Sequence, residues 1–234
     1  MHFSYFIVYR RGANRDLAAS DADLERFAGI VRATPGLAKA LVYTPDAAAD
    51  PYLNDGLPPP LAAQLYFGDV ADLEAALARD GHLQALAAPG ALTSLAGAEV
   101  VQQAMLTRTF AVPDPVVRTA PGRVPCSYLV TYPGPAEDLN EWLAFYITHH
   151  PVPMAKLPGI REIEILTRID WCGFLPWPRA NDMLRNKVVF DDAAALAAAL
   201  ASPVRHEMRA DFKRFPPYAG GSTHFPMATR TVAP

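Results

Sequence analysis

Along the chain, segments in which apolar positions follow the period of a strand alternate with segments that follow the period of a helix. The same order of such segments occurs twice. In the first half, they predict strands over 4–9, 37–43, 63–67 and 99–110, and helices from about 20, over 70–79 and over 82–88. In the second half, they predict strands over 127–132, 160–169, 187–190 and 224–232, and helices over 137–149, 191–201 and 203–215. Ser20 is a candidate N-cap of the first helix, and Pro35-Gly36 is expected to end that helix and turn the chain into the next strand. Each half therefore has the order βαββαβ, which is that of a ferredoxin-like unit.

The sequence also matches itself when it is shifted by about 123 positions. Ser4-Tyr5 then falls on Ser127-Tyr128, and Pro35-Gly36 falls on Pro158-Gly159. Matches that stay in nearly one register along both halves indicate an internal repeat. We therefore predict a first repeat over 1–112, a linker rich in proline and glycine over 113–125, and a second repeat over 126–234.

The first strand is apolar on both faces. Phe3, Tyr5 and Ile7 alternate with Phe6 and Val8, so both faces of this strand are expected to be buried. The two helices of a ferredoxin-like unit cover only one face of its sheet, and the second half is the nearest cover for the other. We predict an α+β fold in which two ferredoxin-like βαββαβ repeats form one intrachain α+β barrel, a pseudo-dimer. Its interior is either a packed core or a pocket.

Composition narrows the range of functions. The chain has 234 residues, of which 51% are hydrophobic, and 21 Lys and Arg against 24 Asp and Glu give a net charge of −3. A nucleic-acid partner would favour a clustered basic surface, and no apolar run is long enough for a membrane helix. With no signal-peptide pattern and only two cysteines, we expect a cytoplasmic protein with no nucleic-acid or membrane partner. Nucleotide-binding, serine-hydrolase and zinc-protease motifs are absent from the sequence.

The two halves differ most where their first helix ends. The second half has His149-His150 where the first has Arg26-Phe27. Trp142, Tyr146 and His150 share one side of the helix, and Pro151 is expected to end it at His150. The helix C-terminus favours imidazolium and burial favours neutral imidazole, so His150 could exchange protons near neutral pH. A structural histidine that caps the helix is the other interpretation.

A second difference is the aromatic loop 170–179 of the second half. It carries Trp171, Phe174 and Trp177, whereas the matching loop of the first half has one aromatic residue, Tyr52. Such a loop either covers a hydrophobic pocket or packs on its own barrel or on a partner subunit. The first alternative places a ligand site with aromatic walls in the second half.

Other polar residues give weaker signals. Glu162, Glu164 and Arg168 alternate onto one strand face, which suits a cation site or acid–base work but more often is a solvated face. His224 opens the last strand, and His206 lies on the last helix. Their spacing from His150 matches no metal signature, so we predict no metal site.

The stretch from His150 to Ile160, with its histidine, the proline after it and Leu157-Pro158-Gly159 before a strand, resembles the EthD family of dimeric α+β barrel proteins. With the repeat, the chain looks like a fused pair of EthD-like domains. The resemblance implies that His150 corresponds to a family histidine near a pocket. Related barrels include cofactor-free oxygenases, isomerases, haem-handling enzymes and non-catalytic stress proteins, so the resemblance implies no single reaction.

Two functions therefore stay open. The first is an enzyme that binds a small hydrophobic metabolite, an aromatic compound or a lactone, in the barrel of the second half. His150 would then transfer a proton beside a carbonyl group without a cofactor, in an isomerase or oxygenase type of reaction, with His149 as a second catalytic residue. The ligand-binding residues would be Tyr128, Trp142, Tyr146, Arg168, Trp171, Phe174, Trp177 and His224. The second function is a non-catalytic binding or accessory protein with the same pocket. Either protein could form a homodimer.

Overall fold

The computed structural model describes residues 2–48, 50, 53 and 55–234. The first half contains strands β1 (His2–Arg10), β2 (Leu37–Pro45), β3 (Leu61–Phe67) and β4 (Glu99–Phe110), and helices α1 (Asp21–Arg32) and α2 (Val70–Ala76). Two 3₁₀ segments, His82–Ala87 and Thr93–Leu95, follow α2. The second half contains strands β5 (Cys126–Tyr132), β6 (Ile160–Arg168), β7 (Leu184–Phe190) and β8 (Thr223–Val232). Its helices are α3 (Leu139–His149), α4 (Pro151–Met154), α5 (Ala193–Leu200) and α6 (Val204–Phe212).

The strands close into one antiparallel barrel in the order β1-β3-β2-β8-β5-β7-β6-β4. The predicted α+β barrel is therefore confirmed at the level of a mixed fold with a closed barrel of eight strands. The four strands of each half are neighbours in it, and the halves join where β2 pairs with β8 and β4 pairs with β6. A closed barrel leaves no strand edge unpaired.

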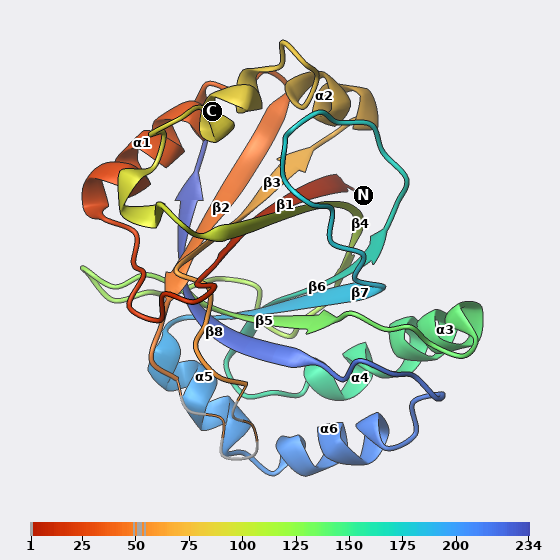
Figure 1. Cartoon of the computed structure of the whole chain (residues 1–234). Helices are drawn as coiled ribbons and strands as arrows, with labels where there is room; N and C mark the ends of the chain where they lie inside the picture. The colour runs from red at the N-terminus through yellow and green to blue at the C-terminus, as the bar shows by residue number, and fades with distance from the viewer. Residues whose placement is uncertain (1, 49, 51–52, 54) are drawn as a thin grey trace.

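Helices lie outside the barrel in two groups (Figure 1). Those of the first half lie at the top of the view and those of the second half at the bottom, with the strands between them. Each group buries an apolar face against the outer side of its own strands. Inward-facing side chains form smaller apolar clusters and a polar network inside the barrel.

The ends of α1 show how the sequence sets local structure. Ser20, the predicted N-cap, accepts a hydrogen bond from the backbone N–H of Asp23 at 3.2 Å and satisfies a donor that the helix leaves free. Gly36 then turns the chain into β2 with a φ of +75°, where a side chain would also collide with Asp72. This prediction of a helix with a Pro-Gly end is confirmed.

The end of α3 differs in part from the prediction. The helix does end at His149, but His150 keeps helical angles (φ −67°, ψ −32°), and α4 begins at once with Pro151. Proline is tolerated in the first turn of a helix because its missing N–H would have no partner there. His150 thus lies at a joint between two helices rather than at a free helix end.

The barrel interior contains the carboxylate pair of β6, which the sequence analysis treated as a solvated face or a cation site. Glu164 is buried, and Lys187 Nζ lies 2.9 Å from Glu164 Oε2 and 2.8 Å from Glu162 Oε1. Tyr66 donates a hydrogen bond of 2.7 Å to the same Glu164 oxygen and so links the two halves of the chain. The solvated-face interpretation is wrong for Glu164, because barrel closure turns that strand face inward.

Among the described residues, no helix is long and apolar enough to cross a membrane.

Candidate functional site

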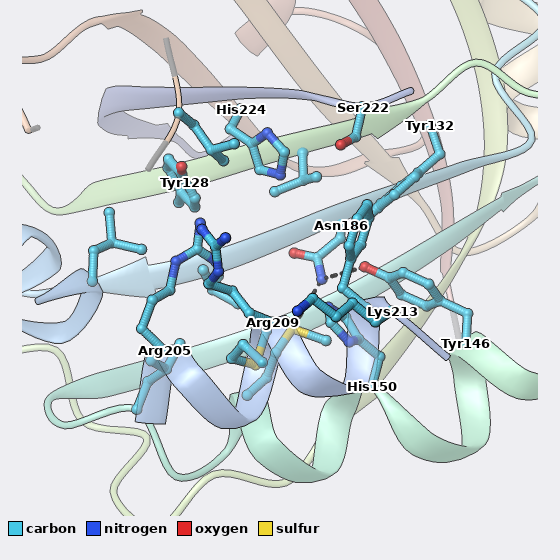
Figure 2. A pocket seen from close by; sticks show the side chains of 18 residues that line it. Tyr128, Tyr132, Tyr146, His150, Asn186, Arg205, Arg209, Lys213, Ser222 and His224 are labelled. Atoms are coloured by element: carbon cyan, nitrogen blue, oxygen red, sulfur yellow. Dashed lines mark hydrogen bonds between the residues drawn. The ribbon is translucent and has the colours of Figure 1, made fainter. Parts of the chain in front are cut away.

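A cavity of about 340 Å³ lies between the outer face of β5, β7 and β8 and the helices of the second half (Figure 2). It is therefore outside the barrel, not within it as the sequence analysis supposed. Its floor is formed by strand side chains, including Tyr128, Asn186 and His224, and its opposite wall by α3, α4 and α6. Apolar residues make up much of the lining, so the cavity suits a small and largely apolar ligand.

His150 and Asp211 form a buried pair at this cavity. His150 Nδ1 lies 2.7 Å from Asp211 Oδ2, and the imidazole is 5% exposed. An ionised carboxylate can only accept, so Nδ1 carries the proton and donates it to Asp211. The second ring nitrogen, Nε2, is then left with its lone pair. Tyr146 and Phe215 pack against the ring, with centroids at 4.7 and 5.0 Å, and fix its plane.

The environment of His150 favours the neutral base. Burial, the largest effect, lowers the pKa of His150 below its usual value, and the charge of Arg205 acts in the same direction. Asp211 opposes this shift but does not reverse it. The hydrogen bond from His150 in turn lowers the pKa of Asp211. At neutral pH the pair is therefore an orienting carboxylate and a neutral imidazole, the arrangement of a general base.

Asn186 of β7 lies on the cavity floor, in contact with Tyr146 of α3. Its amide nitrogen donates hydrogen bonds to the hydroxyl of Tyr146 and to the sulfur of Met154, each at 3.0 Å (Figure 2). Its amide oxygen is buried and has no hydrogen-bond partner among the described residues. An unsatisfied acceptor of this kind costs free energy unless a ligand supplies a donor.

Two carboxylates that lie between β2 and β3 of the first half contact side chains that line this cavity. Asp50 accepts hydrogen bonds of 2.8 Å from Tyr128 and from Arg205. Asp55 Oδ2 lies 2.8 Å from His224 Nδ1, so a second His–Asp pair faces the cavity. Burial lowers the pKa of His224, as it does for His150.

Helix α6 gives the cavity a positive wall. Arg205 and Arg209 of α6 and Lys213, directly after it, are spaced by four residues and all line the cavity. Figure 2 shows Arg205 near Tyr128, where Asp50 pairs with it, and Lys213 near His150 and Asn186. Residues at this spacing lie on one side of a helix. A positive wall beside a general base stabilises the anion that forms when the base removes a proton.

The corresponding space of the first half is filled. Phe27 stands where the second half has His150, and its ring lies 6.4 Å from that of Tyr9. The aromatic loop of the second half supplies the rest of the filling, because Trp171 and Trp177 pack on Tyr5 and Tyr9 with centroids at 5.6 and 6.1 Å. In Figure 1 this cyan loop rises from the strands of the second half towards α2.

The expectation that the aromatic loop walls the cavity of His150 is therefore wrong. Gln102 of β4 holds the loop in the first half by donating hydrogen bonds to the backbone oxygens of Leu175 and Trp177 at 3.1 and 2.6 Å. The physical reason is burial. The loop carries two indole rings, and the apolar surface on which they are buried belongs to the first half. Phe174 stays half exposed under the guanidinium of Arg79.

Three further expected site residues do not line the cavity. His149 points away from the cavity, because neighbouring positions of a helix point about 100° apart. Its side chain is exposed, and its Nδ1 lies 2.9 Å from the carbonyl oxygen of Phe145. Trp142 is fully buried behind Tyr146, on which it stacks at 5.2 Å. Arg168 lies at the end of β6 and donates to Asn181 at 2.8 Å. The structure does bring Tyr128, Tyr146, His150 and His224 together.

Sequence reasoning missed Asp211, Asn186 and the row on α6. Asp211 is 61 positions from His150, and no local pattern marks two residues that meet only after folding. The row on α6 had a visible signal, since basic residues at 205, 209 and 213 lie on one side of a predicted helix. Among the described residues, no three histidine, cysteine, aspartate or glutamate side chains are placed to share a metal ion.

No protein-family model matches the chain, and no curated protein is similar to it in sequence. Solved structures do match. An anthrone oxidase-like protein is 14% identical with a TM-score of 0.64, over 98% of this chain and 92% of its own. A proposed monooxygenase from Lactobacillus acidophilus is 12% identical with a TM-score of 0.55, over 100% of this chain and 97% of its own.

An EthD family protein from Bacillus halodurans, 17% identical, matches 42% of this chain and 96% of its own, at a TM-score of 0.34. At these identities the likeness to the two longer matches concerns the fold alone. The chain thus has the α+β barrel fold of the anthrone oxidase-like protein and of the proposed monooxygenase.

Proposed function

We propose that the chain is a small-molecule oxygenase or oxidase that removes a proton from a carbon atom activated by a carbonyl group to which it is conjugated. The observation that carries this proposal is the His150–Asp211 pair, a neutral imidazole oriented by a carboxylate at an apolar cavity. The names of the anthrone oxidase-like protein and the proposed monooxygenase favour oxygen chemistry over the isomerisation that the same base could perform.

The substrate class follows from the cavity. Its apolar lining and the tyrosine rings suit an aromatic ketone, and a lactone of similar size is a second candidate. The Asn186 oxygen accepts a hydrogen bond from a substrate hydroxyl, and the cations of α6 face the carbonyl oxygen. Tyr128 and His224 complete the opposite end of the cavity.

The reaction begins when Nε2 of His150 takes a proton from the activated carbon. The C–H electron pair stays on the substrate as an enolate, and the positive wall of α6 stabilises that charge. For anthrone, the carbanion reduces dioxygen and forms a carbon-bound peroxide, which takes back the proton held on Nε2 of His150. The hydroperoxide then loses the remaining hydrogen of that carbon together with OH, as water, to give anthraquinone. The sum is anthrone plus O₂ to anthraquinone plus water, and no organic cofactor takes part in this balance.

Anthrone is the first substrate to test, with oxygen uptake and quinone absorbance as readouts. The expected result is turnover above the spontaneous rate, and a loss of on the order of 10²–10⁴ in kcat for His150→Gln. His149→Gln is the matched control, because its ring lies outside the cavity, and it should keep full activity.

Other outcomes separate the alternatives. Binding of anthrone without conversion, with an affinity that His150→Gln leaves unchanged, would show a non-catalytic binding protein instead. A Soret band on addition of haem, with activity that depends on it, would contradict a cofactor-free reaction.

We also infer that the chain is a fused pair of EthD-like units with the limits 1–112 and 126–234. The hydroxyls of Ser4 and Thr107 lie 2.6 Å apart, and those of the corresponding Ser127 and Thr229 lie 2.7 Å apart. The strand order is β4-β1-β3-β2 in the first half and β8-β5-β7-β6 in the second, which is the same order in each. Residues 113–125 between them contain no helix or strand and would be the linker.

A further inference from the structure

A second cavity, of about 490 Å³, lies inside one end of the barrel. It is lined by inward-facing side chains of β1, β5, β6, β7 and β8, at the end where β1 and β5 finish and β7 and β8 begin. Phe6, Leu129, Leu166 and Phe225 give it apolar walls. It differs from the cavity of His150, because the sheet formed by β5 and β7 lies between the two.

The mouth of this cavity is strongly basic. Arg10, Arg11 and Arg185 all line it, together with the buried Lys187, and no carboxylate is among the described residues that do. Lys187 is neutralised by Glu162 and Glu164 deeper in the barrel. The three arginines therefore determine the charge at the mouth.

Their existing partners compensate these charges only in part. Asp182 accepts from Nε and Nη2 of Arg185 at 3.1 and 2.7 Å, which leaves Nη1 outside this ion pair. Arg11 donates to the backbone oxygens of Pro58, Arg15 and Leu17, so it is fixed in place by neutral acceptors.

Arg10 and Arg185 line the same mouth, and each acts on the charge of the other. Burial lowers the pKa of Arg185; Asp182 opposes this shift, and the charge of Arg10 adds to it. Guanidinium groups held together beside an apolar space match a ligand that has one anionic end and an apolar body. A carboxylate suits them best, because arginine binds it with two parallel hydrogen bonds.

We propose that this end of the barrel binds an amphipathic carboxylate. The carboxylate lies on Arg10 and Arg185 at the mouth, and the hydrocarbon part fills the space among Phe6, Leu129 and Phe225. Such a ligand removes apolar surface from water and relieves the repulsion between the arginines. This site is independent of the proposed reaction at His150.

Calorimetric titration of the full chain with decanoate, below the concentration at which it forms micelles, tests the proposal. Decanoate should bind, and decanol, which has no charge, should bind at least about tenfold more weakly. Arg10→Gln should weaken decanoate binding about tenfold, since it removes an exposed cation that packs little. Val8→Trp should abolish binding by filling the mouth.

Two control variants decide the location. Arg32→Gln removes an exposed charge on α1 and should leave decanoate binding unchanged. Arg209→Gln removes a charge from the cavity of His150 and should also leave it unchanged. Absence of decanoate binding would overturn the proposal. So would binding that Arg209→Gln weakens and Arg10→Gln does not, because decanoate would then occupy the other cavity. If Val8→Trp does not fold, Arg10→Gln alone decides.

Discussion

At the scale of single residues, one position separates the halves most clearly. Phe27, within α1, and His150, at the end of α3, occupy corresponding places in the two halves, 123 positions apart. Phe27 completes an apolar cluster, whereas the buried ring nitrogen Nδ1 of His150 needs a hydrogen-bond acceptor, which Asp211 provides. A buried polar group without such a partner would cost about 1–3 kcal/mol. Asp211 is therefore the residue on which the orientation of His150 depends.

Replacement of Asp211 by asparagine should reduce kcat by on the order of 10²-fold or more, because the imidazole loses its fixed tautomer. Asp211 raises the pKa of His150 against the effect of burial, so its removal should lower that pKa further. The acid limb of the rate profile reflects protonation of the base and should move to lower pH. A pH–rate profile of both proteins checks this.

A purely structural role for Asp211 would give a different profile. Asp211→Asn would then lower the amount of folded protein and leave the position of the acid limb where it was. Full activity in Asp211→Asn would contradict the role assigned to the pair.

At the scale of elements, two loops that connect strands each contact the opposite half of the chain. The loop between β6 and β7 fills the first half with Trp171, Leu175 and Trp177. The loop between β2 and β3 brings Asp50 and Asp55 to the cavity of the second half. Each loop therefore packs on the half to which it does not belong. The aromatic loop stabilises the fold, and the acidic one supports the site.

Trp171→Ala should lower the free energy of unfolding by about 3–5 kcal/mol, since it empties part of a filled space. It should leave kcat/KM of the reaction at His150 unchanged, because the loop lies on the other half. Guanidinium unfolding and steady-state kinetics give the two values. Phe174→Ala, on the same loop but half exposed, is the control and should cost less than about 1 kcal/mol.

The elements themselves could be predicted more completely than their contacts. Strand alternation, the Ser20 cap and the Pro35-Gly36 turn are local signals, and each element they predict is present. The short helix after Pro151 was missed, since X-Pro usually marks a helix end. The position of Trp171 was missed as well, because whether a loop covers its own half or the other depends on long-range packing. Of the expected site, His150 and Tyr146 could be found from helical spacing, but Asp211 could not.

At the scale of the whole molecule, a buried charge network connects the two halves inside the barrel. Burial would lower the pKa of Lys187, but Tyr43, Glu164 and Tyr66 outweigh it and raise that pKa. Burial would raise the pKa of Glu164, but Lys187 and the hydrogen bonds from Tyr66 and Gln64 together outweigh it and lower that pKa. Both groups are therefore charged at neutral pH, and Tyr66 of the first half donates to the carboxylate of the second.

Glu164→Gln should lower the free energy of unfolding by about 3 kcal/mol, because it leaves a buried ammonium group with less compensation. The double variant Glu164→Leu with Lys187→Met should lose much less, since it removes both charges. Denaturant unfolding compares them. Glu207→Gln breaks the exposed pair with Lys156 and should cost less than about 1 kcal/mol. Equal losses for Glu164→Gln and Glu207→Gln would contradict the importance of the buried network.

The filled first half and the open second half bear on the proposed fusion of two EthD-like units. Two identical subunits of a symmetric dimer must both keep a histidine at this position or both lose it. Once two copies are joined in one polypeptide, mutations reach each copy separately. One copy can then give up its site for stability, as Phe27 and the tryptophan loop indicate, while the other keeps its cavity. The proposed fusion would thus explain why the second half has an open cavity between its helices and its strands where the first half is filled, and a single ligand molecule per chain should saturate that site.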